Sequence, residues 1–165
     1  PTGPVQTFTI DSTSARQAVD MSSDDAAGIL LRFNNGARGT VSISQISSGR
    51  KNSINWEISG PEGSLAFDSE NPEQLWIGHR GRANEVLHKD PGMLSANAAK
   101  TAFYPGGHVE GFSETFRGLF ERVYEDINNG TESNSYPTFA DGVKSLEITD
   151  AIAQSSKNSA WVKIA

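Results

Sequence analysis

The sequence predicts an α+β fold, a mostly antiparallel open β-sheet with helices packed on one of its faces. In the first half of the 165-residue chain, apolar and polar residues alternate with the period of two that strands require. In the second half, apolar residues recur at the spacings of three and four that one face of a helix requires. Short turn sequences separate the alternating segments, and such turns join antiparallel strands. We therefore expect residues 1–165 to form a single α+β domain.

The first half contains about seven alternating segments, each bounded by turn residues. Residues 34–36, Asn-Asn-Gly, are expected to supply the positive φ angles of a tight hairpin. Residues 60–63, Gly-Pro-Glu-Gly, are expected to turn the chain again. The expected strands are VQTFTI, AGILLRF, VSIS, INWEIS, SLAFDS, QLWIGH and NEVLHK.

Two helices are expected in the second half. The first covers residues 110–129, and Gly130 is a natural stop because glycine readily adopts the left-handed conformation that ends helices. The second covers about 138–157 and opens with Thr138 and Asp141, which are spaced as in a capping box.

Two other segments complete the chain. Residues 90–107 show no steady period, and unstructured connections of this length are often functional loops. Residues 160–165, AWVKIA, are expected to return to the sheet as a closing strand.

Composition excludes several classes of function. The net charge of −6 and the isoelectric point near 5.0 provide no field that attracts nucleic acid or an anionic membrane. The chain has no cysteine, so it has neither disulfides nor thiolate metal sites, and this suits a reducing compartment. It also has no apolar run of membrane-spanning length and no export pattern at its first residues, so a cytoplasmic location is expected.

One face of the predicted sheet is polar without being strongly charged. It includes Ser42, Ser44, Asn55 and Glu57. Such a face suits either solvent or a second sheet packed against it. We therefore expect a homo-oligomer through the open sheet face.

Residues 105–112, PGGHVEGF, are the main candidate for chemistry. The two glycines before His108 let the backbone approach a ligand closely, and histidine both donates and accepts hydrogen bonds. His108 can therefore serve either a pocket or a structural hydrogen bond. Glu110 is interpreted mainly as a charge or cap in the first turn of the following helix, where the helix dipole favours an acid.

Familiar catalytic signatures are absent from the sequence. It contains no GxxxxGK[ST] motif and no GxGxxG motif, because GGHVEG has His108 where the second glycine is required. No HExxH spacing supports a metal site, and no GxSxG elbow supports a serine hydrolase. Residues 78–82, GHRGR, suit either an anionic group or a charged hairpin end.

Three segments, in this order and spacing, resemble the C-terminal domain of the Gfo/Idh/MocA family of NAD(P)-dependent oxidoreductases. They are DDAAGILLRFNNGARGTVSISQISSGRKNSINWEISGPEGSLAFDSENPEQLWIG, PGGHVEGF and YPTFADGVKSLEITDAIAQSSKNSAWVKI. The resemblance implies a longer parent enzyme whose N-terminal Rossmann domain, absent from this chain, binds NAD or NADP. The family's lysine of the EKP motif and its frequent catalytic Asp and His lie in segments outside this sequence. No cofactor, no metal and no catalytic residue are therefore expected in this chain, which should be inactive alone.

The resemblance also implies substrate-side residues and a substrate class. His108 resembles the family histidine that faces the sugar, with Tyr104 and Glu110 as neighbours. Arg50, in GRKN, and Arg16, after the first strand, are further substrate-binding candidates. The parent would oxidise a CH–OH group of a sugar or polyol. The alternative is a non-catalytic carbohydrate-binding or dimerisation module.

Overall fold

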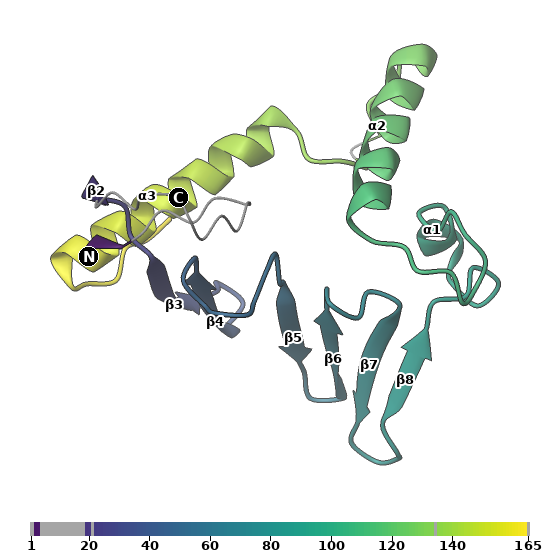
Figure 1. The fold of residues 1–165 in the computed structure, drawn as a ribbon, viewed down its shortest axis with the longest axis horizontal. Coiled ribbons are helices and arrows are strands. Elements are labelled where there is room, and N and C mark those ends of the chain that lie inside the picture. The colour runs from purple at the N-terminus through teal and green to yellow at the C-terminus, as the bar shows by residue number, and fades with distance from the viewer. Residues whose placement is uncertain (1, 4–18, 21, 134, 165) are drawn as a thin grey trace, which may run out of the picture. The chain divides into compact units, whose positions relative to one another are not determined.

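The computed structural model describes residues 2–3, 19–20, 22–133 and 135–164, and its elements are shown in Figure 1. The chain divides into two units, Pro1–Gly49 and Arg50–Ala165, which are described separately. The described strands precede the helices and pair antiparallel, so the predicted α+β class is confirmed. The strand expected at residues 5–10 and the candidate Arg16 lie outside the described residues.

The first unit contains two antiparallel pairs. One is short, β1 (Thr2–Gly3) with β2 (Val19–Asp20). The other pairs β3 (Ala26–Arg32) with β4 (Arg38–Ser44) over the whole length of both strands.

The β3–β4 turn differs from the prediction in one respect. Gly36 has a φ of 91°, and its N–H donates to the Phe33 carbonyl at 3.0 Å, while the Phe33 N–H donates to Ala37 at 3.1 Å. The two asparagines at 34 and 35 keep negative φ. A single glycine thus supplies the left-handed residue, because this longer turn needs only one.

The second unit begins with a four-stranded antiparallel meander in the order β5-β6-β7-β8. Its strands are β5 (Asn55–Ser59), β6 (Gly63–Asp68), β7 (Gln74–His79) and β8 (Glu85–His88). Four of the predicted strands are therefore confirmed. The predicted turn at 60–63 is confirmed as well, with the Gly60 N–H donating to the Gly63 carbonyl at 2.9 Å.

The register of this meander gives its two faces different chemistry, since alternate residues point to opposite sides. One face has an apolar row across all four strands, formed by Trp56, Phe67, Leu75 and Leu87. The other face has a mixed row, formed by Glu57, Ala66, Trp76 and Val86. The face predicted to be polar therefore also presents a tryptophan, and its role in an oligomer stays a prediction.

Three helices follow the sheet, α1 (Ala96–Ala99), α2 (Phe112–Asn129) and α3 (Phe139–Asn158). Gly130 ends α2 with a φ of 63°, as predicted. The capping box of Thr138 and Asp141 at the start of α3 is also confirmed. No described helix is both long and apolar enough to cross a membrane.

The predicted closing strand is wrong for the described residues 161–164, which adopt no regular secondary structure. After α3 the chain turns at Ser159, whose φ is 51°. Alternating apolar residues favour a strand only where a sheet edge accepts them, and local sequence does not specify that edge.

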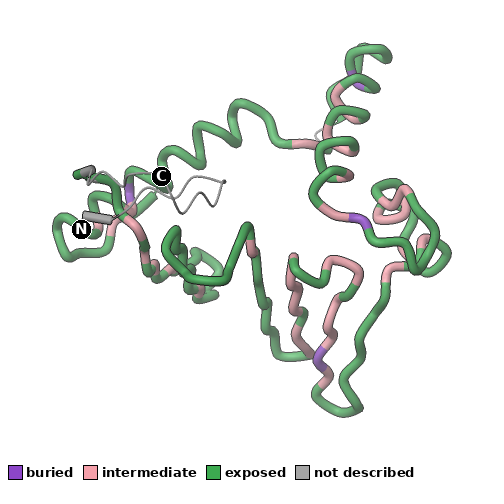
Figure 2. Tube along the Cα trace, viewed as in Figure 1, coloured by how far each residue is buried: buried purple, intermediate pink, exposed green. Residues whose placement is uncertain are grey.

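Most described residues are exposed or half-buried, as the colours in Figure 2 show. Two of the few buried residues are the acids Glu110 and Asp126, with 8% and 6% of their surface exposed. Burying a carboxylate is costly unless charges or hydrogen bonds compensate. The partners of these two acids therefore show where the sequence has built specific polar structure.

Candidate functional site

The candidate site begins at the ends of two neighbouring strands. Glu73 directly precedes β7 and Lys89 directly follows β8, so antiparallel pairing brings them together. The Lys89 N–H donates to the Glu73 carbonyl at 2.8 Å, and the Lys89 Nζ lies 3.3 Å from Glu73 Oε2. The edge of the sheet thus presents a lysine and a carboxylate side by side.

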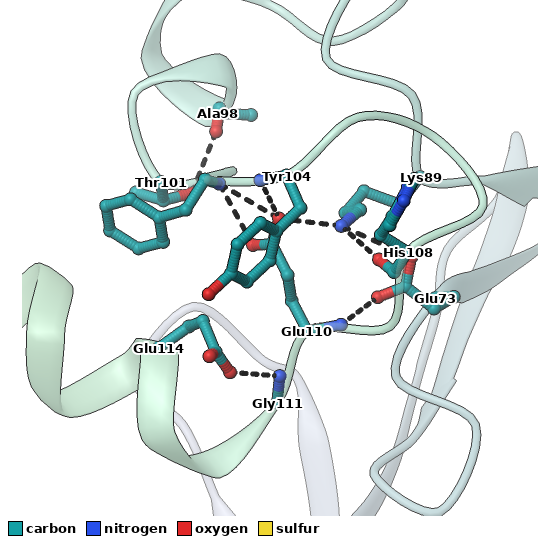
Figure 3. A network of polar contacts seen from close by, with 10 residues as sticks. Glu73, Lys89, Ala98, Thr101, Tyr104, His108, Glu110, Gly111 and Glu114 are labelled. Carbon is teal, nitrogen blue, oxygen red and sulfur yellow. Dashed lines mark hydrogen bonds and ion pairs between the residues drawn. The ribbon is translucent and has the colours of Figure 1, made fainter.

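Glu110 joins this pair from the segment before α2, as Figure 3 shows. Its Oε1 lies 2.7 Å from Lys89 Nζ, and its own N–H donates to Glu73 Oε1 at 2.7 Å. Its carboxylate also accepts the backbone N–H of Phe103 at 2.9 and 3.1 Å and the backbone N–H of Tyr104. We call Glu73, Lys89 and Glu110 the charged cluster.

Lys89 and Glu110 of the charged cluster are largely withdrawn from solvent. The side chains of Lys89 and Glu110 are only 13% and 9% exposed. Burial alone would raise the pKa of Glu110, but the Lys89 ammonium and the N–H groups of Phe103 and Tyr104 outweigh it and lower that pKa. Burial likewise opposes the charge of Lys89, yet hydrogen bonds to Glu110 and Glu73 raise the pKa of its ammonium.

Residues 103–110 form a loop that the charged cluster holds at both ends. Glu110 binds the two N–H groups at the start, and Lys89 Nζ donates to the His108 carbonyl at 2.9 Å near the end. Between them, the His108 N–H donates to the Pro105 carbonyl at 3.2 Å in a turn where Gly107 has a φ of 82°. The backbone of this loop is therefore fixed by hydrogen bonds.

Two polar side chains remain available on the same loop. Tyr104 is 43% exposed and His108 is also exposed. Neither the Tyr104 hydroxyl nor the His108 imidazole forms a hydrogen bond with another described residue. Together they offer donors and acceptors to a ligand without breaking an internal contact.

Helix α2 is fastened to this loop from its first turns. The Arg117 guanidinium lies 4.1 Å from the centre of the Phe103 ring, a cation–π contact. The Gly111 N–H donates to Glu114 Oε2 at 2.8 Å. Glu114, and not Glu110, is therefore the acid that caps the helix. The interpretation of Glu110 as a first-turn charge is corrected, because its carboxylate turns back to the loop.

These features belong to a recognisable domain. A family model described as the C-terminal alpha/beta domain of an oxidoreductase family, Gfo/Idh/MocA, matches residues 2–164. The chain belongs to this family.

Known relatives share this C-terminal domain. Levoglucosan dehydrogenase from Pseudarthrobacter phenanthrenivorans is 29% identical over 147 residues, 86% of this chain and 36% of the relative. An oxidoreductase from Sinorhizobium meliloti superposes with a TM-score of 0.82 at 29% identity, over 87% of this chain and 42% of that one. The Gfo/Idh/MocA domain described here thus spans about two fifths of these relatives.

Two of the related structures are complexes with ligands. A levoglucosan dehydrogenase in complex with NADH and levoglucosan has a TM-score of 0.77 at 28% identity, over 87% of this chain and 39% of that one. An inositol dehydrogenase homolog from Azotobacter vinelandii, complexed with NADH and myo-inositol, has a TM-score of 0.73 at 26% identity, over 85% and 39%.

Within the Gfo/Idh/MocA domain, the predicted site residues lie in different places. Tyr104 and His108 share the loop of residues 103–110. Arg50 forms an ion pair with Glu70 in the β6–β7 connection, and no described contact joins it to that loop. Arg16 lies outside the described residues. The structure therefore brings together two of the four predicted substrate-binding residues.

Sequence reasoning missed Lys89 and Glu73. They are separated from Glu110 by 21 and 37 positions, and neither is part of a local motif. The one available signal is that each stands at the boundary of a predicted strand. Among the described residues, no group of three or more His, Asp or Glu side chains could hold a metal ion.

The charged cluster forms part of the wall of a cleft of about 590 Å³. The residues that line it include Glu73, Lys89, Phe103, Glu110, Arg122 and Tyr136. Tyr104 and His108 do not line it, so they present their side chains elsewhere.

Proposed function

We propose that this domain forms the substrate side of an NAD(P)-dependent dehydrogenase that oxidises a CH–OH group of a sugar or polyol. The observation that supports it is the similarity to the two complexes described with NADH and with levoglucosan or myo-inositol. Both ligands are rich in hydroxyl groups. A domain that orients them needs exposed hydrogen-bonding side chains on a fixed backbone, which the loop of residues 103–110 provides.

On this proposal the chain contributes orientation and hydrogen bonding. His108 and Tyr104 bind substrate hydroxyls, and the clamped backbone beneath them limits their motion. NAD or NADP, bound by a part of the protein outside this sequence, supplies the hydride chemistry. The domain alone is then inactive.

The mixed face of the β5–β8 sheet favours a second role, as oligomer interface. A shallow cleft on it is lined by residues that include Asn55, Glu57, Gln74, Trp76 and Val86. Aromatic residues such as Trp76 are enriched at interfaces, whereas carboxylates such as Glu57 are more typical of the interface rim. The same residues would also suit a carbohydrate ligand. In that alternative the domain is a non-catalytic carbohydrate-binding or dimerisation module.

The test uses the full-length protein that carries this domain. Reduction of NAD and NADP is followed by absorbance with levoglucosan, myo-inositol and other polyols. The variant His108→Ala should lower kcat/KM for the best substrate by about fivefold or more, since a lost hydrogen bond costs about 1 kcal/mol or more. Its dissociation constant for the dinucleotide should not change.

The matched control is His88→Ala, which removes the other exposed histidine, on β8. It should leave kcat/KM unchanged. Sugar binding without any nicotinamide reduction by the wild type would favour the binding module. An unchanged kcat/KM in His108→Ala would remove His108 from the site.

A further inference from the structure

We propose that the charged cluster of Glu73, Lys89 and Glu110 consists of positioning residues. Its contacts hold the backbone of the loop of residues 103–110 in the conformation that binds substrate, and in this role we call the cluster the clamp. The inference deepens the proposed function and rests on it for the identity of the substrate.

The first reason is which atoms of the loop the clamp binds. Glu110 accepts the N–H groups of Phe103 and Tyr104, and Lys89 donates to the carbonyl of His108. All three are peptide groups, so the clamp fixes the backbone at the positions that carry Tyr104 and His108. The contacts leave both side chains free to meet a ligand.

The second reason is the cost of placing these charges out of water. Replacing a buried ion pair with well-packed apolar residues is often neutral or stabilising, so stability alone does not explain its presence. Apolar side chains cannot bind peptide N–H and C=O groups. The charged cluster therefore achieves something that an apolar core cannot, namely a defined path for the loop.

The third reason is the attachment of the clamp to regular structure. Glu73 and Lys89 stand at the ends of β7 and β8, whose backbones are joined there by the Lys89 N–H to Glu73 C=O bond of 2.8 Å. Arg117 on α2 makes a cation–π contact with the Phe103 ring at the start of the loop. Groups supported by strands and helices are positioned more accurately than groups on loops.

The experiment compares Lys89→Met with Lys89→Arg in the full-length protein. Lys144→Met is the matched control, because Lys144 forms an exposed ion pair with Glu147 on α3. Hydrogen–deuterium exchange should show the amides of Phe103 and Tyr104 exchanging at least tenfold faster in Lys89→Met. Lys89→Arg should restore slow exchange, and Lys144→Met should not change it.

Kinetics and calorimetry provide the second readout. In Lys89→Met, kcat/KM for the polyol and polyol affinity should fall about 10- to 100-fold, since small misplacements cause losses of that order. Dinucleotide affinity should stay within twofold. Lys89→Arg should recover most of the loss. Should Lys89→Met not fold, Glu110→Gln provides the same comparison, because it keeps the shape but removes the charge.

The outcomes separate the two proposals. Unchanged exchange, or faster exchange with unchanged polyol affinity and kcat/KM, overturns the positioning role. A wild type that binds polyol without oxidising it overturns the proposed dehydrogenase. The clamp is then tested by the amide exchange of Phe103 and Tyr104 and by polyol affinity alone. A wild type that neither binds nor oxidises any polyol overturns both.

Discussion

Asp126 and Ser133 are joined by two hydrogen bonds, from the Ser133 N–H at 2.8 Å and from the Ser133 hydroxyl at 2.9 Å to Asp126 Oδ2. The Thr131 hydroxyl donates to Oδ1 at 2.8 Å. Asp126 lies in the last turn of α2, where the helix dipole disfavours an acid. These donors compensate for that position and fasten the α2–α3 connection to the end of the helix.

The same contacts make the stability of the folded protein depend on pH in the acid range. The Ser133 N–H and the Thr131 hydroxyl lower the pKa of Asp126 from 3.8 to about 2, although burial opposes them. Because the unfolded chain takes up this proton first, the stabilisation is complete above the unfolded pKa and is lost as the pH falls towards 2. Asp126→Asn should therefore reduce stability at neutral pH and flatten its decline between about pH 5 and pH 2.

Urea denaturation across that pH range measures this effect. Glu125→Gln is the control, because Glu125 is an exposed neighbour on α2 with no described hydrogen-bond partner. It should not reproduce the flattened curve. If the stability of Asp126→Asn falls with decreasing pH as steeply as that of the wild type, the hydrogen bonds around Asp126 do not cause the loss of stability in acid.

The Lys89–Glu110 pair should matter far more for stability than an exposed pair. Lys89→Met leaves Glu110 buried without its cation, and breaking a buried pair in this way costs about 3 kcal/mol. Lys144→Met breaks the exposed Lys144–Glu147 pair, which should cost less than about 0.5 kcal/mol. Chemical denaturation at pH 7 gives both values, and equal losses would show that the cluster is not coupled to folding.

The fold was predictable wherever a few neighbouring residues determine it. The capping pair of Thr138 and Asp141, the left-handed Gly130 and the alternation in β5–β8 are all local signals, and the structure confirms them. The closing strand expected at 160–165 is wrong for the described residues 161–164, because alternation alone does not specify a partner strand.

The candidate site was predictable only in part, for the same physical reason. His108 and Tyr104 lie on one loop in the structure, close together in the sequence as well. The charged cluster depends on strand pairing that brings Glu73 to Lys89, and on a return of the chain that brings Glu110 to both. Glu110 was consequently assigned to the nearest helix, although its charged partners Glu73 and Lys89 are distant in sequence.

The two glycines before His108 should respond oppositely to alanine. Gly107 has a φ of 82°, a conformation that costs an L-residue about 1–2 kcal/mol, although an added Cβ would meet no atom within 4 Å. At Gly106 the φ is not left-handed, and an added Cβ would lie 3.5 Å from the Lys89 carbonyl oxygen, an ordinary contact. Gly107→Ala should therefore destabilise the protein by about 1 kcal/mol, while Gly106→Ala should be neutral or slightly stabilising because it restricts the unfolded chain. Thermal unfolding measures the change in stability for both variants.

In the full-length protein, kcat/KM for the polyol should fall only in Gly107→Ala, since the strained turn moves His108 out of place. Equal effects of the two substitutions on unfolding would mean that the turn relaxes freely, and His108 would then not depend on its left-handed residue.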